Sequence, residues 1–264
     1  MKIGFIGAGK MGGAILKGII TSNFCNPCNI FVAENNQELA EELKNSLKIN
    51  IGSMQEVIKN TDVIIICTKP FVIKDVLSSI KDIITPDKLI ISIAAGISTA
   101  TIQSILNNIP VIRVMPNTPA LLQEGISALT KGTFATEEHL QLALEIFSKV
   151  GKAIVVKEEL MDAVTGVSGS GPAFYYLIIE ALAKGGEELG LSKEIALELS
   201  AQTAIGAAKM ILETNKTPET LRKEVTTPGG TTEQGLIVLD NNNIVQTLID
   251  TVHATAKKSK ELGA

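Results

Sequence analysis

Short runs of consecutive apolar residues alternate with segments of helical spacing over residues 1–157. The apolar runs lie at residues 2–7, 29–33, 62–67, 88–94, 110–115 and 152–156. Residues 11–21 and 36–47, which separate the first three runs, carry apolar side chains at helical spacing. Continuous Ile and Val runs separated by helices are typical of a parallel sheet that is covered on both faces. We therefore predict a doubly wound α/β domain over residues 1–157.

From residue 158 onward the apolar spacing is helical throughout, and no segment has a convincing strand pattern. Helices are expected over residues 162–190, 192–214, 217–225, 231–240 and 242–262. Ser192 and Thr217 stand where N-cap residues belong, and Pro218 suits the first helical position. Residues 158–264 are therefore predicted to form a second, all-helical domain.

Charge and hydropathy narrow the class of protein. The 264 residues carry a formal net charge of −4, which gives no electrostatic footprint for nucleic acid or an anionic membrane. No apolar run reaches the roughly 18–20 residues that span a bilayer. We therefore expect a cytoplasmic protein with no nucleic-acid and no membrane partner.

Three glycines follow the first apolar run in the spacing G-x-G-x-x-G. Gly7, Gly9 and Gly12 stand directly after a predicted strand and open a predicted helix. In this context the spacing indicates a dinucleotide site: the first glycine permits a tight turn, the second lets pyrophosphate approach, and the third lets helix pack on strand. The helix N-terminus would face the phosphates. A glycine-rich turn of an ordinary α/β protein is the alternative.

Glu34 ends the second predicted strand, where an acidic side chain usually accepts a hydrogen bond from the ribose 2′-OH and disfavours a 2′-phosphate. Neither Asn35 nor Asn36 is an arginine that could pair with such a phosphate. The sequence therefore favours NADH over NADPH. A solvated loop carboxylate is the alternative interpretation of Glu34.

Two proline-containing loops, CTKP at residues 67–70 and MPNTP at residues 115–119, follow strands on the same expected edge of the sheet. Ligands of such sheets bind at the carboxyl ends of the strands. Lys69 could thus approach a cofactor, and Asn117 could bind its nicotinamide side. Two strand ends terminated by proline would look the same.

The segment TTPGGTT near the end of the chain is a second candidate site. Gly229 and Gly230 are poor helix formers and indicate a turn, so Thr231 and Thr232 would begin the next helix. A helix N-terminus with free N–H groups and hydroxyls binds anions. No Lys or Arg lies between residues 224 and 256, which favours a small carboxylate over a phosphate. Simple capping by threonine is the alternative.

The helix start SGSGPA, at residues 168–173, has no basic side chain near it in sequence. Residues 158–183 contain no Lys, Arg or His. Ketone reduction usually needs a positioned acid such as His or Lys, whereas a protonated imine already carries its positive charge. Orientation of the substrate against a hydride donor is then the main task. His139 and His253 lie in polar helical stretches and are interpreted as surface residues.

The cysteines do not indicate a metal site. Cys25 and Cys28 form a C-x-x-C pair, but a zinc site would need about two more ligands at suitable spacing. We interpret the pair as part of a proline turn, with a metal or redox role as the alternative. Cys67 is expected to be a small core residue in a strand.

Across essentially its whole length the chain resembles the pyrroline-5-carboxylate reductase family. The resemblance rests on six motifs in this order: IGAGKMGGAI, CTKP, ISIAAGI, RVMPNTPA, DAVTGVSGSGPAF and TTPGGTTEQGL. It implies a Rossmann domain followed by a helical domain for dimerisation and substrate binding, and reduction of 1-pyrroline-5-carboxylate to L-proline by NADPH or NADH. It also implies a homodimer, with decamers built from dimers as a larger assembly.

The resemblance also implies roles for individual residues. Thr165 would be the catalytic residue, as an orienting hydrogen-bond donor to the ring nitrogen. The substrate would be bound by Ser168, Thr227, Gly229, Gly230, Thr231 and Thr232, with Pro228 in the same loop. The cofactor would be bound by Ile6, Gly7, Ala8, Gly9, Lys10, Met11, Gly12, Glu34, Asn35, Cys67, Thr68, Lys69, Pro70, Ala94, Ala95, Met115 and Asn117.

Two other functions compete with imine reduction. A hydroxyacid dehydrogenase of similar layout would carry a lysine shortly after the second glycine-rich helix start, where this chain has Tyr175 and Tyr176. A nucleotide sensor without activity would not need the carboxylate loop. Turnover of the substrate separates the sensor from the enzyme.

Overall fold

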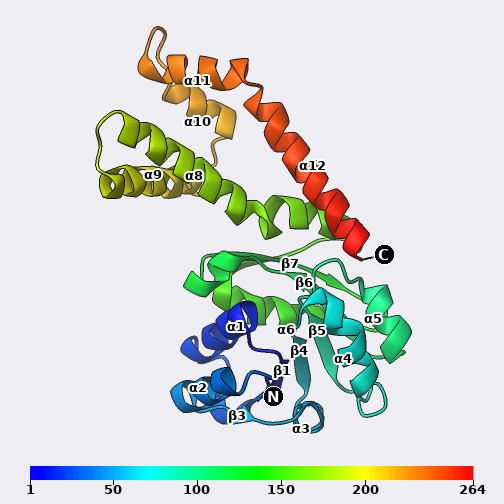
Figure 1. Ribbon diagram of the computed structural model, residues 1–264. Helices are drawn as coiled ribbons and strands as arrows, with labels where there is room; N and C mark the ends of the chain where they lie inside the picture. The colour runs from blue at the N-terminus through cyan, green and yellow to red at the C-terminus, as the bar shows by residue number, and fades with distance from the viewer. Residues whose placement is uncertain (264) are drawn as a thin grey trace. The chain divides into compact units, whose positions relative to one another are not determined.

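The computed structural model describes residues 1–263, and contacts divide the chain into two compact units. The first unit comprises Met1–Ser170 together with the C-terminal residues from Ala254 onward. The second unit comprises Gly171–His253 (Figure 1).

The first unit is built on one eight-stranded sheet of order β3-β2-β1-β4-β5-β6-β7-β8. The strands are β1 (Ile3–Ile6), β2 (Ile30–Ala33), β3 (Asn50–Ile51), β4 (Val63–Ile66), β5 (Leu89–Ser92), β6 (Val111–Met115), β7 (Gly125–Lys131) and β8 (Gly151–Val155). Strands β1 to β6 pair in parallel, and β1 lies between β2 and β4. The chain winds outward from β1 in both directions, so the crevice for a ligand opens at the carboxyl ends of β1 and β4.

The predicted parallel sheet is confirmed, but two of its strands, β3 and β7, were not expected from the sequence. Strand β7 runs antiparallel to β6, and the expected strand β8 is parallel to β7. Strand β7 lacks a run of Ile and Val because its buried positions include Ser127 and Thr130, which sit in the sheet interior as small polar residues. Strand β3 has only two residues, too few for a periodic pattern.

Helices cover both faces of the sheet, as Figure 1 shows. On one face α1 (Lys10–Thr21), α2 (Gln37–Leu47) and α6 (Glu137–Phe147) pack on a core that includes Phe5 and Ile65. On the other face α3 (Met54–Asn60), α4 (Ile73–Ile80) and α5 (Thr99–Leu106) pack on a core that includes Ile64 and Ile66. Successive residues of a strand point to opposite faces, so the Ile and Val runs supply both cores at once.

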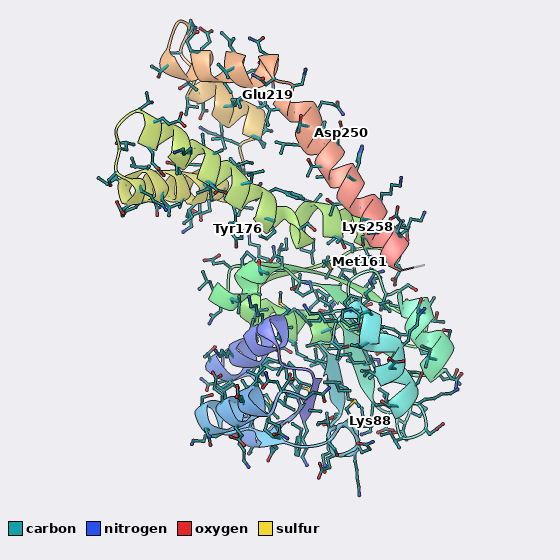
Figure 2. All side chains as sticks on the ribbon, in the orientation of Figure 1. Lys88, Met161, Tyr176, Glu219, Asp250 and Lys258 are labelled. Carbon is teal, nitrogen blue, oxygen red and sulfur yellow. The ribbon has the colours of Figure 1, made fainter. Side chains whose placement is uncertain are left out.

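Short turns of helix connect these elements. The 3₁₀ turns are η1 (Pro27–Asn29), η2 (Pro70–Val72), η3 (Thr118–Leu122), η4 (Ser148–Val150) and η5 (Glu158–Leu160). After η5 come the short helix α7 (Met161–Val164) and one π-helical turn, η6 (Thr165–Gly169). Met161 is completely buried (Figure 2).

Side-chain hydrogen bonds hold η5 and the segment after it in the first unit. Glu158 accepts hydrogen bonds from Thr99 and Arg113, and Asp162 accepts one from Ser259 at 2.7 Å. The compact units therefore divide after Ser170, and the C-terminal residues return to the sheet unit. The domain boundary at residue 157 stays a prediction.

The second unit consists of helices, as predicted. They are α8 (Gly171–Glu188), α9 (Lys193–Glu213), α10 (Pro218–Glu224), α11 (Thr231–Asn241) and α12 (Ile244–Leu262), the last of which ends in the first unit. Ser192 caps α9, and Thr217 caps α10 with Pro218 at its first position. Both caps were expected from the sequence.

The helical unit leaves many apolar side chains exposed in the single chain. Tyr176, on α8, keeps 61% of its surface exposed (Figure 2). Helix α9 is long and apolar enough to cross a membrane by length and composition, although only 6% of its apolar window is buried. No apolar stretch of this length was expected from the sequence, because that expectation rests on runs of consecutive apolar residues. Helix α9 reaches the mean hydropathy of a membrane span because its Ala and Ile residues outweigh its scattered charges. One such helix is weak evidence for a membrane span.

The contact between β1 and α3 gives a test of the fold. A side chain at Gly4 would place its Cβ 2.5 Å from Cγ1 of Val57 and 2.7 Å from Oγ1 of Thr61. Gly4→Ala should therefore lower the free energy of unfolding by about 1–3 kcal/mol through overpacking. Urea denaturation followed by circular dichroism measures the change.

Gly13→Ala is the matched control for this prediction. Its added Cβ would lie 3.4 Å from the carbonyl oxygen of Ala8, an ordinary contact, inside helix α1. The better helix propensity should leave stability unchanged or raise it by up to about 1 kcal/mol. Equal stability of the Gly4→Ala protein and the original would contradict the packing described.

Candidate active site

The turn after β1 brings the three glycines of the spacing motif against the exit of β4. Gly7 has a φ of +84°, and its N–H donates to the carbonyl of Ala33 at 2.8 Å. A Cβ at Gly12 would lie 2.8 Å from the carbonyl oxygen of Gly7 and 3.0 Å from Cβ of Cys67. Glycine at both positions therefore lets helix α1 start directly on the turn.

Gly9 has a different environment, because no heavy atom lies within 4 Å of the position a Cβ would take. It is the N-cap residue of α1, with no side-chain cap, and the first turn contains no acidic residue. The first N–H groups of α1, starting with those of Lys10 and Met11, therefore have no side-chain acceptor at the cap and form a candidate anion site. Ile6 and Ala8 are buried beside this turn.

Glu34 is bound to the same turn. Its carboxylate accepts a hydrogen bond from the N–H of Ala8 at 2.7 Å and from the N–H of Asn36 at 2.9 Å. Asn35 is exposed, and Asn36 caps helix α2. The negative charge predicted from the end of β2 thus lies next to the glycine turn, where a ribose or its phosphate would be recognised.

The loop after β4 adds a hydroxyl without a partner. Oγ1 of Thr68 is buried and has no hydrogen-bond partner within residues 1–263. A Cβ at Gly7 would be 3.5 Å from Cγ2 of the same residue, so the hydroxyl belongs to the glycine turn. Lys69 is exposed, and Pro70 begins η2. A buried polar atom that is left unpaired is a natural site for a ligand contact.

Cys67 lies just after β4 rather than within it, which corrects the expectation of a strand residue. Its N–H donates to the carbonyl of Ile6 at 2.9 Å. Burial raises the pKa of its thiol, so the side chain stays protonated at neutral pH and acts in packing.

The loops after β5 and β6 complete the carboxyl edge of the sheet. Ala94 is buried and Ala95 half-buried, and the following Gly96 has a φ of +76°. A side chain at Gly96 would meet the backbone of Ser259 at 3.1 Å, so the end of α12 packs on this loop. Asn117 is buried, and its Oδ1 accepts from the N–H of Ile126 at 2.9 Å, which leaves its amide N–H₂ as the donor for a ligand.

These features fit a dinucleotide. The uncapped N-terminus of α1, the open space at Gly9 and the unpaired hydroxyl of Thr68 all lie at the point where the strand order reverses. The predicted cofactor residues belong to the last positions of β1 and β6, to the turns at this edge or to the first positions of α1. Their contact with a cofactor stays a prediction.

Thr165 lies at the same edge of the sheet, in the π-helical turn. Its hydroxyl Oγ1 donates a hydrogen bond to the carbonyl of Met161, four residues earlier, at 2.9 Å. The carbonyl of Thr165 accepts from the N–H of Ser170, five residues on, at 2.9 Å. A Cβ at Gly169 would collide with the terminal methyl of Met115, so this turn packs on the end of β6. Single π turns inside helices frequently mark functional sites.

The predicted substrate residues fall into two groups. Ser168 lies in the π turn, where its hydroxyl donates to the carbonyl of Val164 at 3.0 Å. The others form the loop between α10 and α11 in the helical unit: Thr227, Pro228, Gly229, Gly230, Thr231 and Thr232.

That loop has the form of a helix N-terminus. Gly229 has a φ of +73°, and Gly230 is the N-cap of α11, with no side-chain cap. The N–H of Gly230 donates to the carbonyl of Thr227 at 2.9 Å. Thr231 and Thr232 occupy the first turn of α11, and their N–H groups and hydroxyls are the donors that a bound anion would use.

Sequence reasoning missed two charged residues near these loops. Glu233 accepts a hydrogen bond from the N–H of Gly229 at 2.8 Å, so one donor of the loop is already satisfied by a carboxylate. Arg113, inside β6, is buried and paired with Glu158. The sequence signal that could have identified Arg113 is its place within a run of Ile and Val.

The histidines and the Cys25–Cys28 pair lie outside the candidate site described above. Nδ1 of His139 accepts from the N–H of Thr136 at the start of α6, and His253 is exposed. Cys25 is buried and Cys28 exposed, both as free thiols. Over residues 1–263 no group of three or more His, Cys, Asp or Glu side chains could hold a metal ion.

Comparison with known proteins gives matches over the whole chain. Residues 158–262 match the family described as pyrroline-5-carboxylate reductase dimerisation, and residues 2–96 match NADP oxidoreductase, coenzyme F420-dependent. The pyrroline-5-carboxylate reductase of Methanosarcina acetivorans is 45% identical over 99% of this chain and 98% of its own.

Two solved structures agree with this match. The pyrroline-5-carboxylate reductase of Coxiella burnetii is 36% identical, with a TM-score of 0.92, over 100% of this chain and 98% of its own. The pyrroline carboxylate reductase of Plasmodium falciparum, solved with NADP bound, is 31% identical with a TM-score of 0.91 over the same shares. The sequence identity over the full length and the shared fold show that this chain belongs to the pyrroline-5-carboxylate reductase family.

Proposed function

We propose that this chain reduces the C=N bond of L-1-pyrroline-5-carboxylate to give L-proline, the last step of proline biosynthesis, with NAD(P)H as hydride donor. The observation that carries the proposal is the position of Thr165. Its π-helical turn packs on Met115, at the carboxyl edge where the dinucleotide features gather. A hydroxyl at this edge can orient an imine without supplying a proton.

The chemistry asks little of the protein beyond orientation. The cofactor, when bound, supplies a hydride to the carbon of the C=N bond. The uncapped N-terminus of α1 would hold the pyrophosphate, and Thr68 and Asn117 would offer further donors. A protonated imine carries its own positive charge, so no acid residue is needed and binding energy is used for alignment.

Thr165 would act on the imine nitrogen. The sequence resemblance assigned it the role of a donor, but its hydroxyl proton is directed at the carbonyl of Met161. The lone pairs of Oγ1 then remain free to accept a hydrogen bond. The N–H of a protonated imine can donate one to them. The geometry therefore favours Thr165 as the acceptor that orients the ring nitrogen.

The loop before α11 would hold the substrate carboxylate. Thr231 and Thr232 offer hydroxyls and N–H groups at a helix N-terminus, where the helix dipole favours a negative charge. Glu233 fixes Gly229 in this loop and limits the number of free donors. A single small carboxylate suits the donors that remain.

The assembly is proposed to be a homodimer formed through the helical domain, residues 158–264. Large apolar side chains that are exposed in the single chain, among them Tyr176, Leu177 and Leu212, would be buried against a second copy. The same burial would account for the apolar character of α9 without a membrane. A decamer built from dimers and a cytoplasmic location belong to the same proposal.

A steady-state assay tests the reaction itself. Pyrroline-5-carboxylate is supplied to the purified protein, and oxidation of NADH and of NADPH is followed separately. Turnover with either cofactor supports the proposal. Binding of both cofactors without turnover would replace it with a nucleotide-sensing role.

The charge of Glu34 gives a prediction on cofactor choice. Because its carboxylate is held at the glycine turn by Ala8 and Asn36, it would repel an adenosine 2′-phosphate there. The protein should prefer NADH, and Glu34→Gln should shift the ratio of kcat/KM values toward NADPH by about tenfold, which is about 1.4 kcal/mol. Glu41→Gln, on the exposed side of α2, is the control and should leave the ratio unchanged. A preference for NADPH in the unmodified protein would refute the role given to Glu34.

The loop before α11 gives a second prediction. Replacing Thr231 and Thr232 together by Ala removes two hydroxyls but leaves the backbone N–H groups in place. KM for pyrroline-5-carboxylate should rise about tenfold or more, since each hydrogen bond to a charged group contributes about 1.5–3 kcal/mol. The Kd for the cofactor, from fluorescence titration, should stay the same. An equal loss of affinity for substrate and cofactor would count against a carboxylate site in this loop.

A further inference from the structure

A buried arginine lies within the sheet at the edge that carries the site. Arg113 is in the middle of β6 and only 5% exposed, and its neighbours Ile112 and Val114 belong to the hydrophobic core. A charged side chain in such a place is costly unless it is paired and hydrogen-bonded. Arg113 is the one arginine or lysine that is buried within residues 1–263.

Its partner is a carboxylate that joins three segments. Nη1 of Arg113 donates to Oε1 of Glu158 at 2.8 Å. The hydroxyl of Thr99 donates to Oε2 of Glu158 at 2.8 Å, and the N–H of Thr99 donates to Oε1 at 3.3 Å. Because Thr99 is the first residue of α5, the carboxylate also lies at a helix N-terminus, where a negative charge is favoured. The pair thus ties β6, α5 and η5 together.

The tied segment leads straight to Thr165. Glu158 begins η5 and precedes Thr165 by seven residues, all of them in the short helical turns η5 and α7. At the far end of the segment, the π turn packs on Met115 through Gly169. Arg113 and Met115 are two positions apart on β6 and therefore point to the same face of the sheet. The segment is held at both ends by side chains of one strand.

We propose that Arg113 is a positioning residue for the reduction, which through its ion pair with Glu158 sets where Thr165 stands above the end of β6. This inference rests on the proposed role of Thr165 as the group that orients the imine. Arg113 itself touches neither substrate nor cofactor in this account. Its loss should therefore lower kcat, with little effect on cofactor affinity, because a small displacement of an orienting group costs rate.

The test compares three variants of the full chain with pyrroline-5-carboxylate and the preferred cofactor. Arg113→Met with Glu158→Gln removes both charges together, so that no buried charge is left unpaired. Thr165→Val removes the orienting hydroxyl, and the third variant combines all three changes. The first should lower kcat about tenfold to a hundredfold, as expected for a misplacement of about 1 Å. The Kd for the cofactor should change by less than about twofold, which corresponds to less than about 0.5 kcal/mol of binding free energy.

The combined variant separates positioning from plain stability. If Arg113 acts through Thr165, the combined variant should have the kcat of Thr165→Val alone, because the effects of coupled residues do not add. A combined loss equal to the product of the two separate losses would overturn the proposal. So would a lower melting temperature with an unchanged kcat, which is the result of a pair that only stabilises the fold.

Two further proteins keep the test decisive. Lys131→Met with Glu137→Gln removes an ion pair of 3.1 Å that is exposed in the same unit, and kcat should stay unchanged. Arg113→Lys keeps the buried charge but lacks the Nη1 atom that donates to Glu158, so it should fold and give an intermediate kcat. Full activity of Arg113→Lys and of the double variant together would refute positioning.

Failure of the proposed function looks different. If the unmodified protein does not turn over pyrroline-5-carboxylate, the proposed reaction is wrong and with it the positioning role. If Thr165→Val keeps full kcat while the Arg113 and Glu158 variant loses it, the assignment of Thr165 is wrong, and Arg113 does not act through it. If Thr165→Val loses kcat and the Arg113 and Glu158 variant does not, the positioning role alone is wrong.

Discussion

The close approach of helix α1 to the turn after β1 is the contact on which the candidate site depends. A Cβ at Gly12 would lie within 3.0 Å of both the Gly7 carbonyl and Cβ of Cys67, so any other residue would push α1 away from the sheet. With glycine there, the N-terminus of α1 points into the crevice between β1 and β4 without a capping side chain. Glu34 and Thr68 are then placed beside it by the strands they follow. One packing constraint thus exposes the uncapped helix N-terminus that is the candidate anion site, and it fixes the neighbours of this N-terminus.

Most of the fold could be predicted because its pattern is local. The Ile and Val runs of β1, β4, β5 and β6 and the helical spacing after residue 158 are properties of short segments. Strand β7 could not be recognised, because Ser127 and Thr130 interrupt its buried apolar residues Ala128 and Leu129, so no run of Ile and Val marks it. The π turn at Thr165 was also hidden, since its spacing is that of a helix with glycines.

The candidate site divides in the same way. The glycine turn and the loop before α11 were predicted from residues that carry backbone requirements, and these are visible in the sequence. Hydrogen bonds between distant segments were not, because partners such as Arg113 and Glu158 lie 45 positions apart. The hydrogen bond from the N–H of Ala8 to Glu34 was predicted only in part. Glu34 was expected at the site, but its backbone partner was not.

The sheet unit and the helical unit differ in how they are stabilised. The first buries two apolar cores on the faces of one sheet, whereas helices α8 and α9 bury only Gly171, Ala183 and Ala196 within the single chain. A helical unit of this kind gains most of its burial from association, which agrees with the dimerisation family that it matches.

Transfer of an isotope label tests the proposed reaction most directly. The reduced cofactor carries deuterium at the transferred position of the nicotinamide, and the product formed from pyrroline-5-carboxylate is analysed by NMR and mass spectrometry. The account predicts L-proline with one deuterium on Cδ, the former C=N carbon, and none when the protein is left out. Oxidation of the cofactor without labelled proline would contradict it.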